Sequence, residues 1–142
     1  MIRKYQNSVL SKVQQMDLEA LDKQGEQLTK LYHVTWEDTE QFMQFLKQLV
    51  ETHKYTSVYG VPRAGLMLAL LFSLKTEVPV TMAIDKNTLV IDDDTVSGLN
   101  LLPYYDKADT VVFGCCEDVI IKPTYIFKTF NKDVRRVWPW SN

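Results

Sequence analysis

Apolar residues from residue 31 onward follow two patterns, short mostly apolar runs and helical stripes. The runs at 31–34, 56–61, 78–84, 89–92, 110–115 and 124–127 predict strands, and their continuity predicts burial on both faces. The stripes at 35–53 and 64–75 predict helices, and 99–105 predicts a short helix. Strands that alternate with helices predict an α/β fold with a mostly parallel central sheet flanked by helices.

The N-terminal part of the chain is polar and has a different pattern. Val9, Val13 and Met16 share one helical stripe, and Gly25 interrupts the segment. We predict one or two helices within residues 2–30. The segment carries no chemical motif, so we divide the chain into an N-terminal helical extension, residues 1–30, and one domain, residues 31–142.

Composition narrows the class of protein. The 142 residues are 46% apolar and 24% charged, as expected for one globular domain, and the net charge of -2 argues against nucleic acid as a partner. The longest apolar stretch, Leu66–Phe72, is too short to span a bilayer, and no secretory signal is recognisable. Cys115 and Cys116 are adjacent, so no disulfide framework is expected. We therefore predict a cytoplasmic protein without a membrane partner.

The first chemical signal is the stretch from Asp92 to Asn100. An apolar strand ends in the acidic residues Asp92–Asp94, and a small-residue turn with Ser97 and Gly98 opens directly into a helix. Backbone amides at a helix start attract anions, and neighbouring carboxylates accept hydrogen bonds from sugar hydroxyls or bind Mg²⁺. This combination suits a ribose phosphate.

Two other interpretations of this stretch are available. Asp92–Asp94 also fits a solvated strand end, with Thr95–Ser97 as an ordinary helix cap. A phosphoacceptor receiver domain also begins with a strand that ends in acidic residues, but about 50 residues after Asp92 are too few for the βα units it still needs.

The second signal is the turn Pro62–Gly65, which again lies between a strand and a helix. Arg63 in this turn has the planar, bidentate geometry that suits a diphosphate. Taken alone, Arg63 is better explained by pairing with a surface carboxylate. Two strand–turn–helix loops in one small sheet, one acidic and one with arginine, favour the phosphate interpretation.

These loops resemble those of type I phosphoribosyltransferases. Asp92–Asn100 looks like the phosphoribosyl diphosphate (PRPP) signature of that family, and Pro62–Gly65 resembles its diphosphate loop. Val34-Thr35-Trp36 and the C-terminal Pro139-Trp140 extend the resemblance to the bacterial xanthine–guanine phosphoribosyltransferases, over about residues 31–142 with a small C-terminal hood.

The resemblance implies a role for each matching position. Asp92 and Asp93 would contact the ribose hydroxyls and Mg²⁺, and Arg63, Ala64 and Gly65 would hold the diphosphate. The 5′-phosphate would be wrapped by the loop residues Thr95, Val96, Ser97, Gly98, Leu99 and Asn100. The implied reaction transfers the phosphoribosyl group to a nucleobase or related acceptor and releases diphosphate.

The acceptor half departs from the family pattern. Val96 stands where purine enzymes usually have an aspartate, and Asn100 replaces a usual threonine. Cys115 stands at the position of the lysine that reads the purine, and Arg135, with Arg136 beside it, at that of the stacking tryptophan. The long mobile loop ahead of the signature is reduced to residues 85–87.

Two hypotheses follow. The first is a PRPP-dependent phosphoribosyltransferase that uses Mg²⁺, binds PRPP or a nucleoside monophosphate together with a nucleobase-like acceptor, and has a homo-oligomer as a further possible state. The second is a non-catalytic regulator that keeps the fold to sense a nucleotide or PRPP, or to bind a partner protein. The basic cluster of the hood fits a solvated edge, an anion site or a small RNA-binding patch; its residues are Lys128, Lys132, Arg135 and Arg136.

Overall fold

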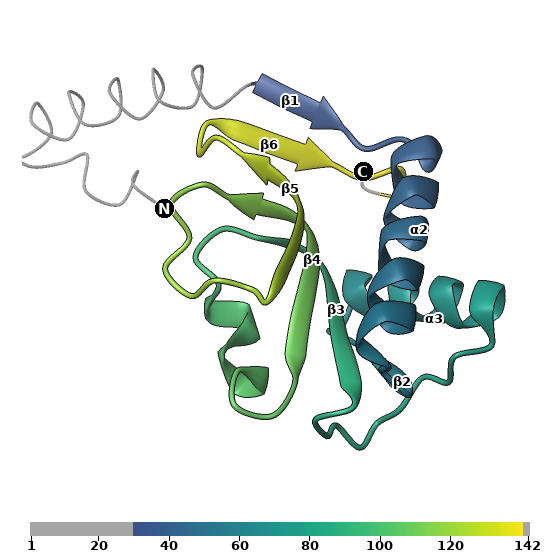
Figure 1. Ribbon diagram of the computed structural model, residues 1–142. Helices are drawn as coiled ribbons and strands as arrows, with labels where there is room; N and C mark the ends of the chain where they lie inside the picture. Colours follow the sequence, from purple (N-terminus) through teal and green to yellow (C-terminus); the bar gives the residue numbers. More distant parts are fainter. Residues whose placement is uncertain (1–29, 141–142) are drawn as a thin grey trace, which may run out of the picture.

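The centre of the molecule is a four-stranded parallel sheet. The structure is a computed structural model and describes residues 30–140. The sheet has the order β2-β3-β4-β5 and consists of β2 (Ser57–Gly60), β3 (Thr88–Thr95), β4 (Asp109–Cys116) and β5 (Tyr125–Phe130) (Figure 1). The predicted α/β fold with a parallel central sheet is confirmed.

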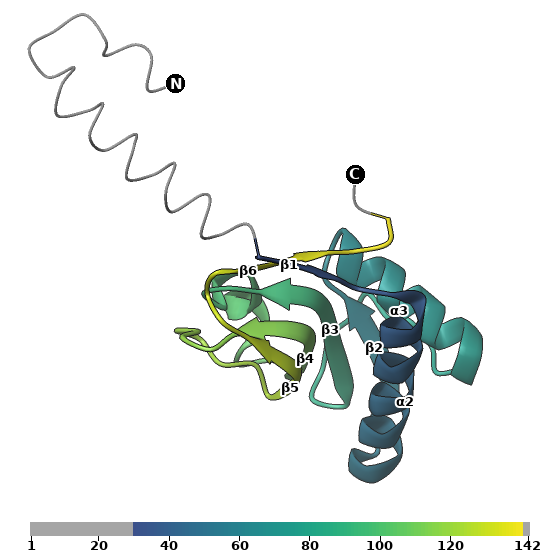
Figure 2. The ribbon, with the colours of Figure 1, turned by 90° about the horizontal axis from the view of Figure 1, so that it is seen from above.

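A second, two-stranded sheet lies beside the first. It pairs β1 (Lys30–His33) in parallel with β6 (Val134–Val137), as Figure 2 shows from above. The Val34 amide continues the ladder by donating to the Val137 carbonyl at 2.8 Å. The predicted hood is therefore built by both ends of the domain. The helices predicted within residues 2–30 fall outside the described residues, except that Lys30 already belongs to β1.

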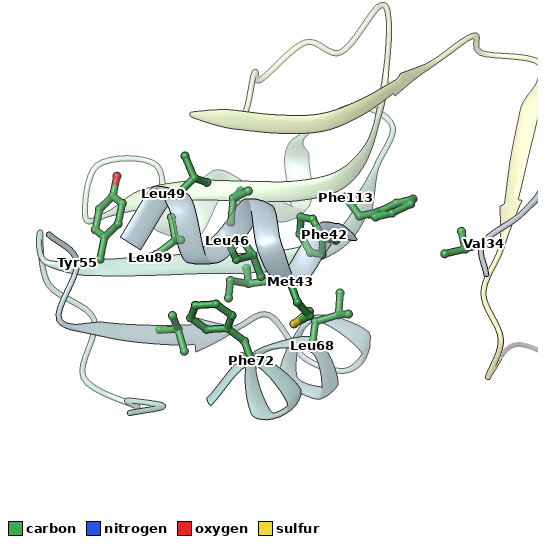
Figure 3. Packing of buried hydrophobic residues seen from close by; sticks show 14 of the residues in the cluster. Val34, Phe42, Met43, Leu46, Leu49, Tyr55, Leu68, Phe72, Leu89 and Phe113 are labelled. Atoms are coloured by element: carbon green, nitrogen blue, oxygen red, sulfur yellow. The ribbon is translucent and has the colours of Figure 1, made fainter. Parts of the chain in front are cut away.

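Helices α2 (Trp36–His53) and α3 (Ala64–Thr76) cover one face of the central sheet. Thr35 caps α2 in a capping box with Asp38. Phe42 and Leu46 of α2 pack with Phe72 of α3 against the strand residue Leu89 (Figure 3). Within residues 30–140, no helix is both long and apolar enough to cross a bilayer.

The opposite face carries a smaller apolar cluster. There Leu101 packs with Val90 and Val112, so successive residues of β3 and β4 alternate between the two clusters. Leu101 belongs to η2 (Leu99–Tyr104), a 3₁₀ helix at the position of the short helix predicted at 99–105. Pro103 lies inside it and has no amide to donate, which keeps the helix short.

The prediction of a strand at 78–84 is wrong. The segment forms a single parallel bridge between Val80 and Val58, in which the Val58 amide donates to Pro79 at 2.9 Å and the Thr81 amide to Val58 at 2.8 Å. Thr81 then turns the chain, because its hydroxyl accepts from the Ala83 amide at 3.0 Å. Since β2 has only this bridge on its outer side, it is the edge strand of the sheet.

Candidate functional site

The two sequence-predicted loops lie side by side. They follow the neighbouring parallel strands β2 and β3, so both are at the carboxyl edge of the sheet, as predicted. Gly65 packs directly on β3, where an added Cβ would lie 2.5 Å from the Ile91 carbonyl oxygen and 3.1 Å from Asp92 Oδ1. A side chain at residue 65 would therefore separate the loops. The absence of one brings the start of α3 against the acidic residues.

The turn Pro62–Gly65 leaves its arginine available. The Leu66 amide donates to the Val61 carbonyl at 3.1 Å and closes the turn, whose Pro62–Arg63 peptide is cis. Arg63 is exposed, and its guanidinium makes no hydrogen bond or ion pair with any residue from 30 to 140. A fixed backbone with an uncommitted arginine is what an anionic ligand requires.

The acidic residues belong to the strand and not to the turn after it. The sequence predicted a strand that ends at Asp92, but β3 continues to Thr95, four residues beyond the pairing of Gly60 with Ile91. The reason is β4, which goes on pairing with β3 as far as Thr95 and Cys115 after β2 has ended. The acidic segment therefore has a strand neighbour on one side only.

Asp92 is almost completely buried and fully hydrogen-bonded. The residue is only 5% exposed. Its Oδ1 accepts a hydrogen bond from the Asp93 amide at 2.8 Å, and its Oδ2 accepts one from Asn100 Nδ2 at 2.6 Å. Burial and, after it, the neighbouring Asp93 carboxylate raise the pKa of Asp92 to about 8, although Asn100 opposes the increase. A ligand that requires the ionised carboxylate must therefore displace a proton from Asp92 below about pH 8.

A chain of hydrogen bonds connects Asp92 to the loop after β3. Asn100 donates to Asp92 and accepts from Thr95 Oγ1 at 2.6 Å, while Thr95 Oγ1 accepts from the Gly98 amide at 3.0 Å. From the sequence, Asn100 is assigned to the 5′-phosphate loop, as a replacement for a usual threonine. Its amide group donates at one end and accepts at the other, and a threonine hydroxyl is too short to do the same across this span.

The loop itself is held from outside as well. Gly98 has φ +84°, and a Cβ there would lie 1.9 Å from the Ile121 carbonyl oxygen, so only glycine fits. The amides of Ile120 and Ile121 both donate to the Ser97 carbonyl, at 3.0 and 2.9 Å. The loop is therefore fixed by the segment after β4.

Some of the amides expected to bind a phosphate are already used. The Gly98 amide donates to Thr95 Oγ1, and the Leu99 amide donates to Ser97 Oγ at 3.2 Å. Among the hydrogen bonds of residues 30–140, none engages the amides of Val96 and Ser97. The part of the predicted cradle that remains for an anion is therefore its first half.

Asp94 differs from Asp92 in that it is paired with an arginine. Arg136 of β6 donates from Nε to Asp94 Oδ2 at 2.8 Å and from Nη2 to Asp94 Oδ1, a bidentate pair. Its side chain is only 4% exposed and lies over the Phe130 ring, 4.8 Å from the centroid. Burial raises the pKa of Asp94, and the Arg136 guanidinium opposes this increase. Sequence reasoning missed this contact across 42 residues.

The residues assigned to the acceptor side are not grouped around an open pocket. Cys115 is fully buried in the smaller apolar cluster, Arg136 is bound to Asp94, and Arg135 beside it is exposed. Val96 is 64% exposed on the loop and brings no acid or base. A role in acceptor binding for Cys115, Arg135 and Arg136 stays a prediction.

The chemistry of the donor set fits Mg²⁺ as a shared ion. Within residues 30–140, no group of three or more His, Cys, Asp or Glu side chains is arranged to hold a metal by itself. Asp92, whose pKa is raised by burial and by Asp93, supplies a carboxylate that a cation would stabilise. Mg²⁺ is commonly held by one or two carboxylates together with the phosphates of its ligand.

The fold is that of the type I phosphoribosyltransferases. A purine phosphoribosyltransferase from Pyrococcus horikoshii superposes with a TM-score of 0.67 at 15% identity, over 79% of this chain and 95% of that one. A xanthine-guanine-hypoxanthine phosphoribosyltransferase from Helicobacter pylori gives 0.59 at 15% identity, over 75% and 92%. At this identity the likeness is one of fold.

A third similar structure is that of a hypothetical protein from Neisseria gonorrhoeae with bound ppGpp. Its TM-score is 0.62 at 13% identity, over 80% of this chain and 90% of that one. No protein-family model matches the chain. No curated protein sequence matches it either.

Proposed function

We propose that the protein binds PRPP at the carboxyl edge of the sheet and transfers its phosphoribosyl group to a nucleobase or related acceptor. The observation that carries the proposal is the contact between the two loops, where Gly65 of one packs on Asp92 of the other. PRPP has a diphosphate on one side of a ribose and a phosphate on the other. Arg63 and the amides of Val96 and Ser97 provide separate anion-binding groups on the two sides of a buried carboxylate.

The chain's own contribution to the reaction is positioning and charge. Arg63 holds the leaving diphosphate, the loop from Thr95 to Asn100 holds the 5′-phosphate, and Asp92 accepts hydrogen bonds from the ribose hydroxyls. Mg²⁺, when bound with Asp92 and Asp93, supplies positive charge against the diphosphate. Because Val96 has no titratable group, no side chain of the loop takes a proton from the acceptor, so an acceptor whose nitrogen is already nucleophilic is expected.

Release of diphosphate from PRPP and Mg²⁺ across a panel of purines, pyrimidines and related heterocycles tests the transfer. We expect release that depends on one acceptor class and is lost in Arg63→Gln, with Lys86→Gln as a control on an exposed turn elsewhere. No acceptor-dependent release, despite measurable PRPP binding, would contradict transfer and leave ligand binding intact.

A second candidate is a sensor of nucleotides that does not react. It is favoured by the acceptor side, where Cys115 is buried and Arg136 is bound to Asp94. A nucleoside monophosphate would present the same ribose 5-phosphate to the loop. In this case calorimetry gives a nucleotide affinity equal to or above that for PRPP, and no diphosphate is released.

The loop amides provide a direct test of phosphate binding. Ser97→Pro removes an amide from the part of the cradle that has no partner within residues 30–140, so the affinity for PRPP is expected to fall about 10-fold, the scale of one lost hydrogen bond to a charged group. Ser97→Ala is the control, since it removes the same hydroxyl and keeps the amide. Equal affinity of wild type and Ser97→Pro in calorimetry would argue against the assignment.

Asp93 is expected to matter for ligand binding more than for stability. Asp93→Asn removes the charge that raises the pKa of Asp92, so the melting temperature should stay unchanged or rise. Binding of PRPP with Mg²⁺ should weaken about 10-fold or more, seen as a smaller ligand-induced shift in thermal melts. Asp106→Asn on an exposed turn is the control. A variant that melts well below wild type and keeps the full shift would make Asp93 a structural residue.

A further inference from the structure

Helix α3 is apolar on both its faces. Leu68, Ala69 and Phe72 are buried against the sheet, as expected for a helix that covers it. The outer positions Met67, Leu70 and Leu74 are also apolar, and Leu74 is 83% exposed. A helix that is apolar all round is normally buried on all sides, so the outer face of α3 calls for a covering partner.

This outer face forms one wall of a groove that contains two tryptophans. Trp36 at the start of α2 and Trp140 near the C-terminus complete the groove, with ring centroids 6.0 Å apart. The groove has a volume of about 320 Å³, and its lining side chains are all apolar. Trp36 is 65% exposed. Such a lining has no charged group for a phosphate, and indole N–H groups are the polar groups of its side chains, so it is separate from the ligand site proposed above and fits an apolar helix face.

The N-terminal sequence supplies a matching surface. Ile2, Tyr5, Val9, Val13, Met16 and Ala20 recur at spacings of three or four residues, which places them on one stripe if residues 2–21 form a helix. The polar positions Asn7 and Ser11 fall on the opposite side of such a helix. A twenty-residue helix is about 30 Å long, enough to cover α3.

The length of the chain allows this segment to reach the groove of its own chain. Trp36 follows Lys30 by six residues, at most about 20 Å, and the eight residues 22–29 span up to about 26 Å. Arg3, Lys4 and Lys12 are the only charged side chains before Asp17. Glu77 follows the end of α3, and Glu40, one helical turn from Trp36, is paired with Lys75 at 2.9 Å.

We propose that residues 2–21 pack as an amphipathic helix into the groove between Trp36, α3 and Trp140 of the same chain. Their apolar stripe covers Met67, Leu70 and Leu74. The N-terminal segment is then part of the folded domain, and its docking does not depend on the ligand site.

Tryptophan fluorescence of the full-length protein tests the proposal, because two of its three tryptophans line the groove and Trp138 is buried. We expect acrylamide to quench wild type weakly. Val9→Asp with Val13→Asp should lower the ratio of docked to undocked chains about 100-fold, roughly 10-fold for each valine withdrawn from apolar contact, and expose Trp36 to the quencher. Asn7→Asp with Ser11→Asp adds the same charge on the opposite side and should leave quenching unchanged.

The molecular mass measured by light scattering distinguishes this proposal from other occupants of the groove. A monomer whose tryptophans are protected in wild type and exposed in Val9→Asp/Val13→Asp supports the proposal. A dimer that this variant converts to a monomer means that the segment docks on a second copy, which overturns it. A dimer that only Leu70→Asp disrupts means that α3 pairs with itself. Strong quenching of wild type means that the groove is open, and this also overturns the proposal.

Discussion

Replacing Arg136 by methionine is expected to lower the free energy of unfolding by about 3 kcal/mol, because it leaves the Asp94 carboxylate without its partner. The lower end of the usual cost applies, since the Asp94 side chain keeps 25% of its exposure. Methionine keeps an apolar contact with Phe130 but also removes the cation–π contact and the bond to the Val134 carbonyl, so the loss reports the contacts of the guanidinium together. Urea denaturation at neutral pH, followed by circular dichroism, measures it.

The neighbouring residue of β6 provides the control. Arg135 is exposed and has no ion pair among residues 30–140, so Arg135→Met should change the free energy of unfolding by less than about 0.5 kcal/mol. Arg136→Lys keeps the charge and loses the bidentate geometry, and an intermediate stability is expected. If Arg136→Met is as stable as Arg135→Met, the pair with Asp94 does not hold the hood on the central sheet.

The stability of this pair also has a consequence for the site. Arg136 connects β6 to the acidic end of β3 through its pair with Asp94. On the other side, Asp94 Oδ1 lies 2.9 Å from the place that a Cβ on Gly114 would occupy. The close approach of Asp94 to β4 therefore needs a glycine at 114. Because Arg136 holds the hood through Asp94, the carboxylates of Asp92 and Asp93 are not used for this contact and remain for the ligand.

The sequence predicts well those parts of the fold that depend on local pattern. The apolar runs at 56–61, 89–92, 110–115 and 124–127 correspond to β2, β3, β4 and β5, and the helical stripe at 35–53 corresponds to α2. The positions of both loops follow from them, since turns after neighbouring parallel strands share one edge of the sheet.

What the sequence could not predict depends on distant partners. The strand at 78–84 is reduced to one bridge because β2 is an edge strand, which is a property of the sheet order. In the sequence, Asp92–Asp94 is a uniform run of acidic residues. In the structure, Arg136 forms an ion pair with Asp94, and Asn100 donates a hydrogen bond to Asp92. Burial decides the rest, since a pattern of letters does not show that Asp92 is covered and that its pKa is raised.

The affinity for PRPP with Mg²⁺ is expected to rise with pH until about pH 8. In the empty protein Asp92 keeps a proton up to about that pH, because burial and Asp93 disfavour its ionised form. Hydrogen bonds from ribose hydroxyls and a bound cation both require the carboxylate. Binding below pH 8 must therefore release a proton, so the affinity changes by up to about 10-fold per pH unit and levels off above pH 8.

The same shift predicts the stability of the empty protein. The folded-state pKa of Asp92 lies above its ordinary value, so the contribution of this group to stability is present in acid and is lost as the pH rises towards about 8. Asp92→Asn removes the titrating group, and thermal melts of this variant should depend less on pH between 5 and 8 than those of wild type. Asp106→Asn, on an exposed turn, should follow wild type.

Calorimetry of wild type and Asp92→Asn at pH 6.5, 7.5 and 8.5 tests whether the protonation of Asp92 controls the affinity. These values lie above the second ionisation of a phosphate group, near pH 6, so the ligand itself contributes little to the slope. Wild type should bind about 10 to 100 times more tightly than the variant at pH 8.5, on the scale of one or two hydrogen bonds to a charged group, and the difference should shrink at pH 6.5. Proton release, measured from the dependence of the binding enthalpy on the buffer, should accompany binding in wild type only. An affinity that is independent of pH and equal in both proteins would place the ligand away from Asp92, and with it the proposed site.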